Sequence, residues 1–261
     1  MSKILKRYPA YLQPVCTLTL AWQVFEDTPV AVAANRDEAI DRPSEPPGPY
    51  RENPNAVAPR DTEAGGTWIG VNEHGLFAGI TNRWNDEELA GERSRGLLVA
   101  DVLSCASTAE ALETVERAMS ASEYAGFSLV VADADDAVWI GWDGAYEVTP
   151  LAAGVHVVVN VGFDDRFSVP ETRSEIGSRQ AENARRLQQV LTPQAGEEAS
   201  GWLERAGAVL GDHEYGVCIH GDGFGTKSST LLALGEEPTF SFADGPPCET
   251  GYEHVAVERH I

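Results

Sequence analysis

Cys16 is the residue of this sequence best placed to act as a nucleophile. It precedes an alternating stretch, Thr17–Trp22, which predicts a core strand and therefore a rigid mount for the thiol. If Cys16 were the first residue of the working protein, its α-amino group, with a pKa of about 7.7–8.0 in small peptides, would be a base for that thiol. The alternative is that Cys16 is a small buried hydrophobic residue, the commonest role of a free cysteine.

Polar residues also stand where predicted strands end. The run Asn35–Glu38 follows an apolar stretch. Within it, Arg36 lies between an asparagine and Asp37, an arrangement that can hold a substrate carbonyl or order a thiolate, but that also suits a solvated turn. Asn82 and Asn160 each end a predicted strand, where a side-chain amide can donate to an oxyanion or cap a loop.

Two further patterns do not specify a bound phosphate or metal. In Gly221–Ser228 the lysine does not directly follow the last glycine, and a strand is predicted next where a phosphate loop needs a helix. The short motif Cys218-x-His220 alone does not define a metal site. The cysteines include no C-x-x-C pair, which argues against a disulfide framework and a structural zinc site; they are Cys16, Cys105, Cys218 and Cys248. We expect no metal and no cofactor.

Charge is the strongest compositional signal. The 261 residues carry 41 acidic against 19 basic side chains, a net charge of −22, and only three of the basic residues are lysines. Such a charge repels nucleic acids and anionic membranes, so we expect a small-molecule substrate or ligand as the partner. Scarce lysine and dispersed acids favour an adaptation to high salt over an ordinary acidic cytosolic protein.

The apolar content bounds the class of protein. With 43% apolar residues, the chain can bury a sizeable core, and its length suits one domain. It has no apolar run of 18 residues and no signal-peptide core near its start, so we expect no membrane span and a cytoplasmic location.

Hairpins dominate the predicted secondary structure. Three are indicated, each with a short polar turn: Cys16–Phe25 with Pro29–Asn35, Thr67–Val71 with Leu76–Thr81, and Phe127–Ala132 with Ala137–Trp142. Further strands are predicted at Val155–Asn160, Gly216–His220, Ser229–Leu234, Thr239–Phe242 and His254–Val257. The Pro- and Gly-rich patches Arg42–Pro54 and Gly245–Pro247 are expected to be surface loops.

Helical patterns occur in two pairs between the groups of strands. They cover Gly96–Cys105, Thr108–Ser120, Thr172–Leu191 and Glu197–Leu210, with Ser107 or Thr108 as the cap of the second. Because hairpins outnumber β–α–β crossings, the sheets should be mainly antiparallel. We predict an α+β fold, a four-layer αββα sandwich of two sheets; a single antiparallel sheet with helices is the alternative.

Several motifs, in one order along the chain, carry a resemblance to a known family. They are Cys16-Thr-Leu, Asn35-Arg36-Asp37-Glu38 with Arg42-Pro43, Gly65-Gly66-Thr67-Trp68-Ile-Gly-Val-Asn72, Thr81-Asn82, Ser94-Arg95-Gly96, and Gly225-Thr226-Lys227-Ser228-Ser229-Thr230. In these the chain resembles the NRDE family, also called the Transport and Golgi organisation protein 2 family. That family is similar to the cysteine N-terminal-nucleophile amidases that cleave bile-salt and penicillin amides.

The resemblance implies the αββα fold and a set of roles. Cys16 would be the nucleophile, with Arg36 and Asp37 beside it, Asn82 would be an oxyanion donor, and Asn160 would match a second active-site asparagine. The implied activity is a cysteine amidohydrolase that cleaves a non-peptide linear amide through an acyl-enzyme. The alternative is a non-catalytic binding protein on the same fold, in keeping with the family's association with haem and lipid handling.

Two departures from the family pattern bear on these roles. Lys227 stands where the family has an arginine, which removes a bidentate anion-binding group. Fifteen residues also precede the cysteine, where family members usually begin Met-Cys. We therefore expect residues 1–15 to be an extension to a single domain over residues 16–261, either a propeptide cleaved after Val15 or a misassigned start, since a GUG codon encodes both valine and initiation.

Overall fold

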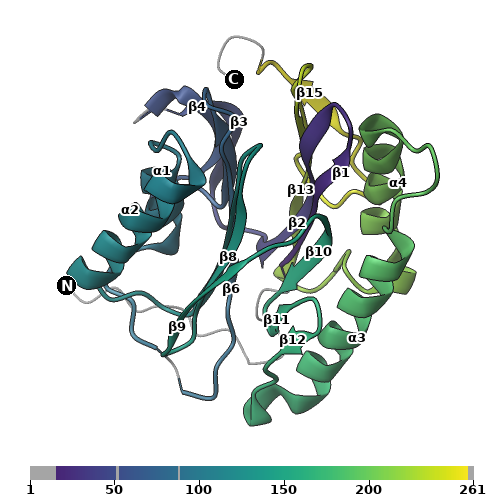
Figure 1. Cartoon of the computed structure of the whole chain (residues 1–261). Coiled ribbons are helices and arrows are strands. Elements are labelled where there is room, and N and C mark those ends of the chain that lie inside the picture. Colours follow the sequence, from purple (N-terminus) through teal and green to yellow (C-terminus); the bar gives the residue numbers. More distant parts are fainter. Residues whose placement is uncertain (1–15, 51–52, 88, 258–261) are drawn as a thin grey trace.

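Two antiparallel sheets, stacked face to face, form the centre of the computed structural model (Figure 1). The structure describes residues 16–257 except 51, 52 and 88, so the expected extension over residues 1–15 lies outside the described part of the chain. The larger sheet has the strand order β12-β11-β10-β1-β2-β13-β14-β15 and the smaller β3-β4-β5-β6-β7-β8-β9. Both contain hairpins between sequence neighbours, as the short polar turns predict.

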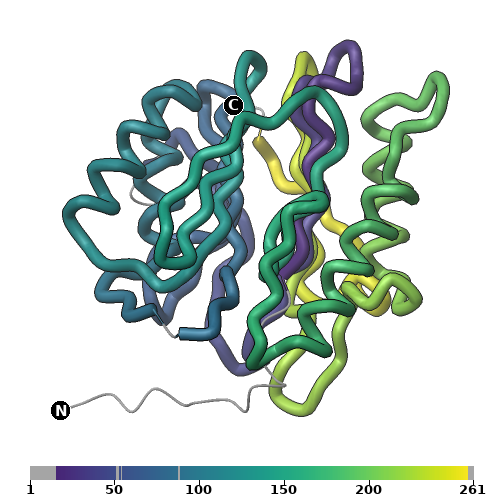
Figure 2. The backbone as a smooth tube through the Cα atoms, turned by 60° about the horizontal axis from the view of Figure 1, so that its bottom comes forward, coloured from purple at the N-terminus to yellow at the C-terminus, as the bar shows by residue number. Residues whose placement is uncertain are grey.

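The strands of the larger sheet are β1 (Thr17–Phe25), β2 (Thr28–Ala39), β10 (Gly154–Val159), β11 (Gly162–Phe163), β12 (Arg166–Phe167), β13 (Phe224–Leu234), β14 (Thr239–Ala243) and β15 (Glu253–Val255). Those of the smaller sheet are β3 (Ser44–Tyr50), β4 (Asn53–Asp61), β5 (Ile69–Asn72), β6 (Phe77–Asn82), β7 (Phe127–Ala132), β8 (Ala137–Trp142) and β9 (Tyr146–Pro150). Figure 2 shows the β1–β2 hairpin between segments from the second half of the chain, and β1 pairs with β10 while β2 pairs with β13.

Helices cover the outer face of each sheet. The helices α1 (Arg95–Val102) and α2 (Thr108–Ala121) lie against the smaller sheet, and α3 (Ser174–Val190) and α4 (Ala199–Gly211) lie against the larger (Figure 1). Short 3-10 turns, η2 (Glu171–Arg173) and η3 (His213–Tyr215), precede α3 and follow α4. The predicted four-layer αββα sandwich is confirmed.

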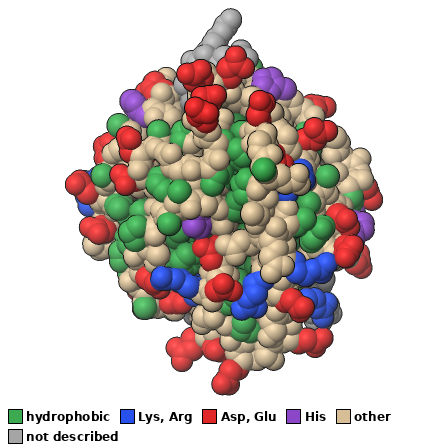
Figure 3. Space-filling view, turned by 45° about the vertical axis from the view of Figure 1, so that its right-hand side comes forward, with side chains coloured by type: hydrophobic (Ala, Val, Ile, Leu, Met, Phe, Trp, Pro, Cys, Tyr) green, Lys and Arg blue, Asp and Glu red, His purple; other side chains and the backbone are tan. Residues whose placement is uncertain are grey.

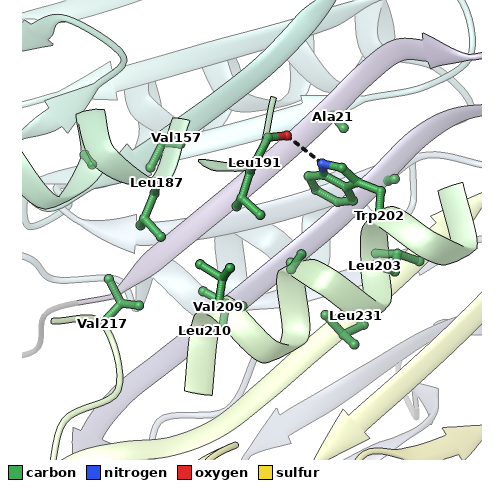
Figure 4. Packing of buried hydrophobic residues seen from close by; sticks show 14 of the residues in the cluster. Ala21, Val157, Leu187, Leu191, Trp202, Leu203, Val209, Leu210, Val217 and Leu231 are labelled. Carbon is green, nitrogen blue, oxygen red and sulfur yellow. Dashed lines mark hydrogen bonds between the residues drawn. The ribbon is translucent and has the colours of Figure 1, made fainter. Parts of the chain in front are cut away.

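Three apolar clusters hold the layers together, one between the sheets and one under each helix pair. In the cluster under α3 and α4, Trp202 is fully buried and its indole donates to the carbonyl of Leu191 at 2.7 Å (Figure 4). That bond satisfies the one polar group the indole brings into the core. Truncating such a side chain to alanine costs about 3–5 kcal/mol, so this cluster fixes the larger sheet to its helices.

Most predicted elements are found within two or three residues of their expected ends. Ser107 is the cap of α2, with its hydroxyl accepting from the backbone N–H of Glu110. None of the helices in the described ranges is both long and apolar enough to cross a bilayer.

Two predictions of local structure are wrong. The segment 216–220 is a loop with one isolated bridge, His220 to Gly225, because Gly216 takes a left-handed backbone (φ 66°) after η3. Part of the expected loop 42–54 is strand β3. Its prolines are tolerated because β3 is the edge of the smaller sheet, where a missing N–H breaks no ladder on the open side.

Candidate functional site

A cavity of about 800 Å³ lies where β1 and β2 of the larger sheet meet the smaller sheet and the loops around it. Four of the predicted site residues line it: Cys16, Arg36, Asp37 and Asn82. Asn160 does not belong to the lining. The structure therefore brings together four residues that lie far apart in the sequence.

The β1–β2 hairpin sets the position of Cys16. Thr17 pairs with Asn35 across this ladder, so the residue before Thr17 faces the polar end of β2. The Cys16 sulfur lies 3.6 Å from the backbone carbonyl oxygen of Asp37, to which the thiol donates. Because Cys16 directly precedes β1 and Asp37 lies on β2, the strand paired with β1, the fold sets their separation.

The electrostatics of Cys16 disfavour a thiolate while residue 15 remains attached. Burial and, secondarily, the carboxyl of Asp37 raise the pKa of the Cys16 thiol to about 12. Arg36 acts in the opposite direction but is the smallest contributor. At neutral pH the thiol is therefore protonated, and a nearby base is needed before it can act as a nucleophile.

Asp37 is a buried carboxyl with one oxygen in use. Its Oδ1 accepts from the hydroxyl of Thr226 at 2.5 Å, whereas its Oδ2 is buried without a hydrogen-bond partner among the described residues. Burial raises the pKa of Asp37 to about 8, against the effect of the Thr226 hydrogen bond. A buried acceptor without a donor is a feature of sites that bind or react.

Arg36 is a buried cation held by its neighbours. Its guanidinium lies 4.1 Å from the centre of the Trp68 ring and within 3.5 and 3.7 Å of carboxylate oxygens of Asp61 and Glu38. Its Nη1 is buried without a partner in the described chain. Burial lowers the pKa of Arg36, but a guanidinium stays charged, so a donor aimed into the site remains.

Asn35 also lines the cavity, but its side-chain amide is bonded to backbone groups of other elements. Its side-chain amide donates to the backbone carbonyls of Leu210 and Val217, at 3.0 and 2.8 Å. Asn35 therefore joins the end of β2 to the end of α4 and to the loop before β13, beside the site residues Arg36 and Asp37.

The two predicted asparagines occupy different positions. Asn82 is half-buried at the end of β6, and its side chain forms no hydrogen bond with another described residue. Asn160 is fully buried; its Nδ2 donates to the backbone carbonyl of Asn82 at 2.7 Å, and its Oδ1 accepts from Gln180 at 2.9 Å. The geometry gives Asn160 contact with Asn82 rather than with the cavity.

Arg95 is a lining residue to which sequence reasoning assigned no role. It is half-buried and donates to the carbonyl of Gly126 at 2.7 Å. The other lining arginines are paired with carboxylates, namely Arg36, Arg42 and Arg93. In the described chain no carboxylate lies within 4.0 Å of Arg95. The motif Ser94-Arg95-Gly96 was the signal that could have identified it.

The close approach of two backbone segments requires glycine at position 66, near Arg95. Gly66 has φ 80°, and a Cβ there would lie 2.2 Å from the backbone of Gly96. Only glycine at position 66 permits this close approach. The contact places Trp68 and the start of α1 on the same cavity.

Lys227 lies outside the cavity lining. It sits at an irregularity of β13 between Thr226 and Ser228, and its ammonium donates to the carbonyl of Ile40 at 2.9 Å. The neighbouring Thr226, which does not line the cavity either, is bonded to the site residue Asp37.

The sequence model described as Transport and Golgi organisation 2 matches residues 15–245. The chain belongs to this family. A Transport and Golgi organization protein 2 homolog of Bos taurus is 25% identical over 237 residues, covering 82% of this chain and 84% of that protein. The homolog of Homo sapiens is 23% identical over 253 residues, covering 85% and 88%.

This member of the Transport and Golgi organisation 2 family is also similar to solved structures. Penicillin V acylase from Agrobacterium tumefaciens superposes with a TM-score of 0.57 at 14% identity, over 88% of this chain and 83% of that one. A Caenorhabditis elegans ortholog of N-acylethanolamine-hydrolyzing acid amidase gives a TM-score of 0.53 at 14% identity, over 83% and 92%. At such identities the likeness shows the fold alone, which is that of the N-terminal-nucleophile hydrolases.

Proposed function

We propose that this protein is a cysteine amidohydrolase that cleaves a non-peptide linear amide through an acyl-enzyme at Cys16. The observation that carries the proposal is the convergence of Cys16, Arg36, Asp37 and Asn82 on one cavity. The fold likeness to penicillin V acylase and to an acid amidase of N-acylethanolamines supports it.

The proposed mechanism begins with a free α-amino group at Cys16. That amine would take the thiol proton, and the thiolate would attack the substrate carbonyl carbon. The side-chain amide of Asn82 would donate to the resulting oxyanion. The protonated amine would then give its proton to the leaving nitrogen as the C–N bond breaks. Water would hydrolyse the thioester in the second half, with the same amine as base.

Asp37 would hold the α-ammonium in place. Its buried Oδ2 has no donor among the described residues, and Cys16 directly precedes β1, the strand paired with β2. An ammonium there would supply that donor and lower the pKa of Asp37 from the raised value of about 8. Removal of residues 1–15, by autoproteolysis or by initiation at codon 15, is therefore part of the proposal.

Arg95 indicates the class of amide. A half-buried guanidinium without a carboxylate partner in the described chain suits a substrate with a carboxylate or another anionic group. Replacement by alanine should raise KM for anionic amides by about tenfold or more and leave KM for neutral ones nearly unchanged. Arg117→Ala, at an exposed site on α2, is the matched control.

The direct test compares two chains against a panel of linear amides. One chain begins at Cys16, and the other retains residues 1–15 as a blocked form. We expect hydrolysis only by the first, and its loss in Cys16→Ala but not in Cys105→Ser, which changes a buried cysteine under α1 and α2. Equal turnover by both chains would contradict the mechanism.

A second candidate is a binding protein for haem or a lipid-like ligand. The raised pKa of the Cys16 thiol, about 12 with residue 15 attached, favours it, because such a thiol is inert. The two functions separate cleanly: a binding protein would retain the ligand in Cys16→Ala with unchanged affinity and would show no turnover in either chain.

We further infer that the protein works in the cytoplasm of a cell with high internal salt. The net charge of −22 and the presence of only three lysines support this. On the face shown in Figure 3 the acidic side chains are dispersed rather than gathered in one patch. Dispersed charge of one sign is tolerated best where salt screens it.

A further inference from the structure

A group of four metal-ligating side chains lies outside the cavity. The side chains of His213, Cys218, His220 and Cys248 converge so that one ligand atom from each lies within 4.8 Å of the others. We propose that this group binds one zinc ion as a structural site. The inference is independent of the proposed amidohydrolase function.

The distances among Cys218, His220 and Cys248 are close to the edges of a tetrahedral site, and the nitrogen of His213 lies within 4.8 Å of these ligand atoms. The two sulfurs are 3.4 Å apart, and the Nε2 atom of His220 lies 3.1 Å from the sulfur of Cys248 and 3.9 Å from that of Cys218. With Zn–S bonds of about 2.3 Å and Zn–N bonds of about 2.0–2.1 Å, a tetrahedron has ligand–ligand edges of about 3.3–3.8 Å. Two thiolates and two imidazoles are also the ligand set that suits zinc.

The fold brings these ligands from two segments. His213 belongs to η3, and Cys218 and His220 follow in the loop before β13. Cys248 lies 30 residues further on, in the loop between β14 and β15. Such a spacing has no C-x-x-C signature, which is why the sequence alone did not indicate a metal.

The surroundings of His220 fit a ligand histidine. Its Nε2 faces the sulfurs, and its Nδ1 lies 4.0 Å from a carboxylate oxygen of Glu249. At this separation, which is longer than a hydrogen bond, the carboxylate acts on the imidazole through its charge and increases its basicity as a ligand. The rings of His213 and His220 meet edge to face at 5.1 Å between centroids, so both can present a nitrogen to one ion.

A disulfide between Cys218 and Cys248 is the competing interpretation of the short sulfur–sulfur distance. It would account for the two cysteines but not for the two imidazoles directed at them. Three of the four ligands are exposed, so an ion could enter the site from solvent. The fourth ligand, Cys218, is buried and would hold the ion against the core.

The site has a structural consequence for the cavity. Between the ligands Cys218 and His220, Ile219 exchanges two hydrogen bonds with Thr226: the Ile219 N–H donates to the hydroxyl, and the Thr226 N–H donates to the Ile219 carbonyl. The same hydroxyl donates to Asp37. A bound ion would therefore fix the loop residue that positions Thr226, the hydrogen-bond donor to Asp37.

The test measures zinc in the full chain, purified with a reductant and without chelators. We expect about one zinc per chain by elemental analysis, loss of it in Cys218→Ser, Cys248→Ser and His220→Ala, and full retention in Cys105→Ser. A chelator should lower the melting temperature of the parent chain and of Cys105→Ser but not that of Cys248→Ser. Cobalt substitution should give the absorption of tetrahedral Co(II) with thiolate ligands.

Two results would overturn the proposal. One is a chain that holds no zinc after dialysis against a small excess of the ion, with thiols kept reduced. The other is a native chain whose intact mass is lower by two hydrogens, with Cys218 and Cys248 joined in one peptide after digestion. Because none of these measurements uses amide turnover, failure of the zinc site and failure of the proposed function are distinguishable.

Discussion

The side-chain amide of Asn160 donates to the backbone carbonyl of Asn82 across 2.7 Å, joining the larger sheet to the strand end that lines the cavity. Asn160 is fully buried and also accepts from Gln180. The amide thus connects α3, the larger sheet and β6, and it holds the backbone from which the Asn82 side chain extends.

Asn160→Ala should lower the free energy of unfolding by about 1–3 kcal/mol, because a buried carbonyl and the Gln180 amide lose their partners. Urea denaturation measures the change. Asn85→Ala, at a half-buried site near the same strand end, is the control. A double-mutant cycle with Gln180→Ala should give a coupling of about 0.5 kcal/mol or more, and strict additivity would show that the bond contributes nothing.

Asp37 should make the full-length chain less stable as pH rises. Its pKa is about 8 in the folded state, against 3.8 ordinarily, so the folded state binds more protons than the unfolded state between those values. The stabilisation that the proton on Asp37 gives to the folded state is fully present below about pH 4 and is lost as pH rises to 8. Asp37→Asn keeps an acceptor for Thr226 but does not titrate. The free energy of unfolding of Asp37→Asn, relative to that of the parent, should therefore be about 1–3 kcal/mol higher at pH 8 than at pH 5. Parallel pH profiles of unfolding for the two chains would contradict this.

His156 adds a second pH dependence in a different window. Both ring nitrogens lie 2.8 Å from acceptors, Asp164 and the Ala152 carbonyl. Burial lowers the pKa of His156, but these hydrogen bonds outweigh it and the net pKa is raised. The stabilisation from the protonated imidazole of His156 is fully present below about pH 6.5, and it is lost as pH rises through the pKa of His156 in the folded state. His156→Gln should cost about 1.5–3 kcal/mol at pH 6 and less at pH 9, measured by urea denaturation; a cost independent of pH would exclude the charged form.

The fold was predictable because its hairpins are local. In the pair β7 and β8 the apolar strands are joined by a turn rich in aspartate, and Asp133 accepts from the backbone of Asp135 and Asp136 in that turn. Strand β3 was missed because prolines are depleted in strands and concentrate at sheet edges and bulges, and the sequence does not say which strand is the edge. The sequence pattern of residues 216–220 predicts a strand; Val217 and Cys218 are indeed buried, but burial alone does not require a ladder.

The site was partly predictable for a similar reason. Cys16, Arg36 and Asp37 are polar or reactive residues at the ends of one hairpin, so local pairing places them together. Asn160 was assigned by its strand end, and only the packing of α3 shows that Gln180 and Asn82 occupy its amide. The zinc ligands could not be found, since a contact across 30 residues depends on the tertiary fold.

Molar salt should stabilise the protein. With a net charge of −22, self-repulsion opposes the compact state at low ionic strength, and the Debye length falls from about 10 Å at 0.1 M to about 3 Å at 1 M. The melting temperature should rise steeply between low and molar KCl. A triple variant, Glu182→Gln with Glu204→Gln and Glu237→Gln at exposed sites, should melt higher at low salt and gain less from KCl. A melting temperature flat in KCl would rule out the high-salt adaptation.

Covalent trapping at Cys16 separates an acyl-enzyme mechanism from ligand binding. The chain beginning at Cys16 is mixed with an excess of a linear amide that has an anionic group, quenched with acid, and its intact mass and peptides are measured. We expect a mass increase equal to the acyl group, located on the Cys16 sulfur and lost on further incubation with water. The increase should be absent from Cys16→Ala and from the chain that retains residues 1–15. Hydrolysis of the amide with no acyl group on Cys16, or an equal acyl group in the chain that retains residues 1–15, would contradict this mechanism.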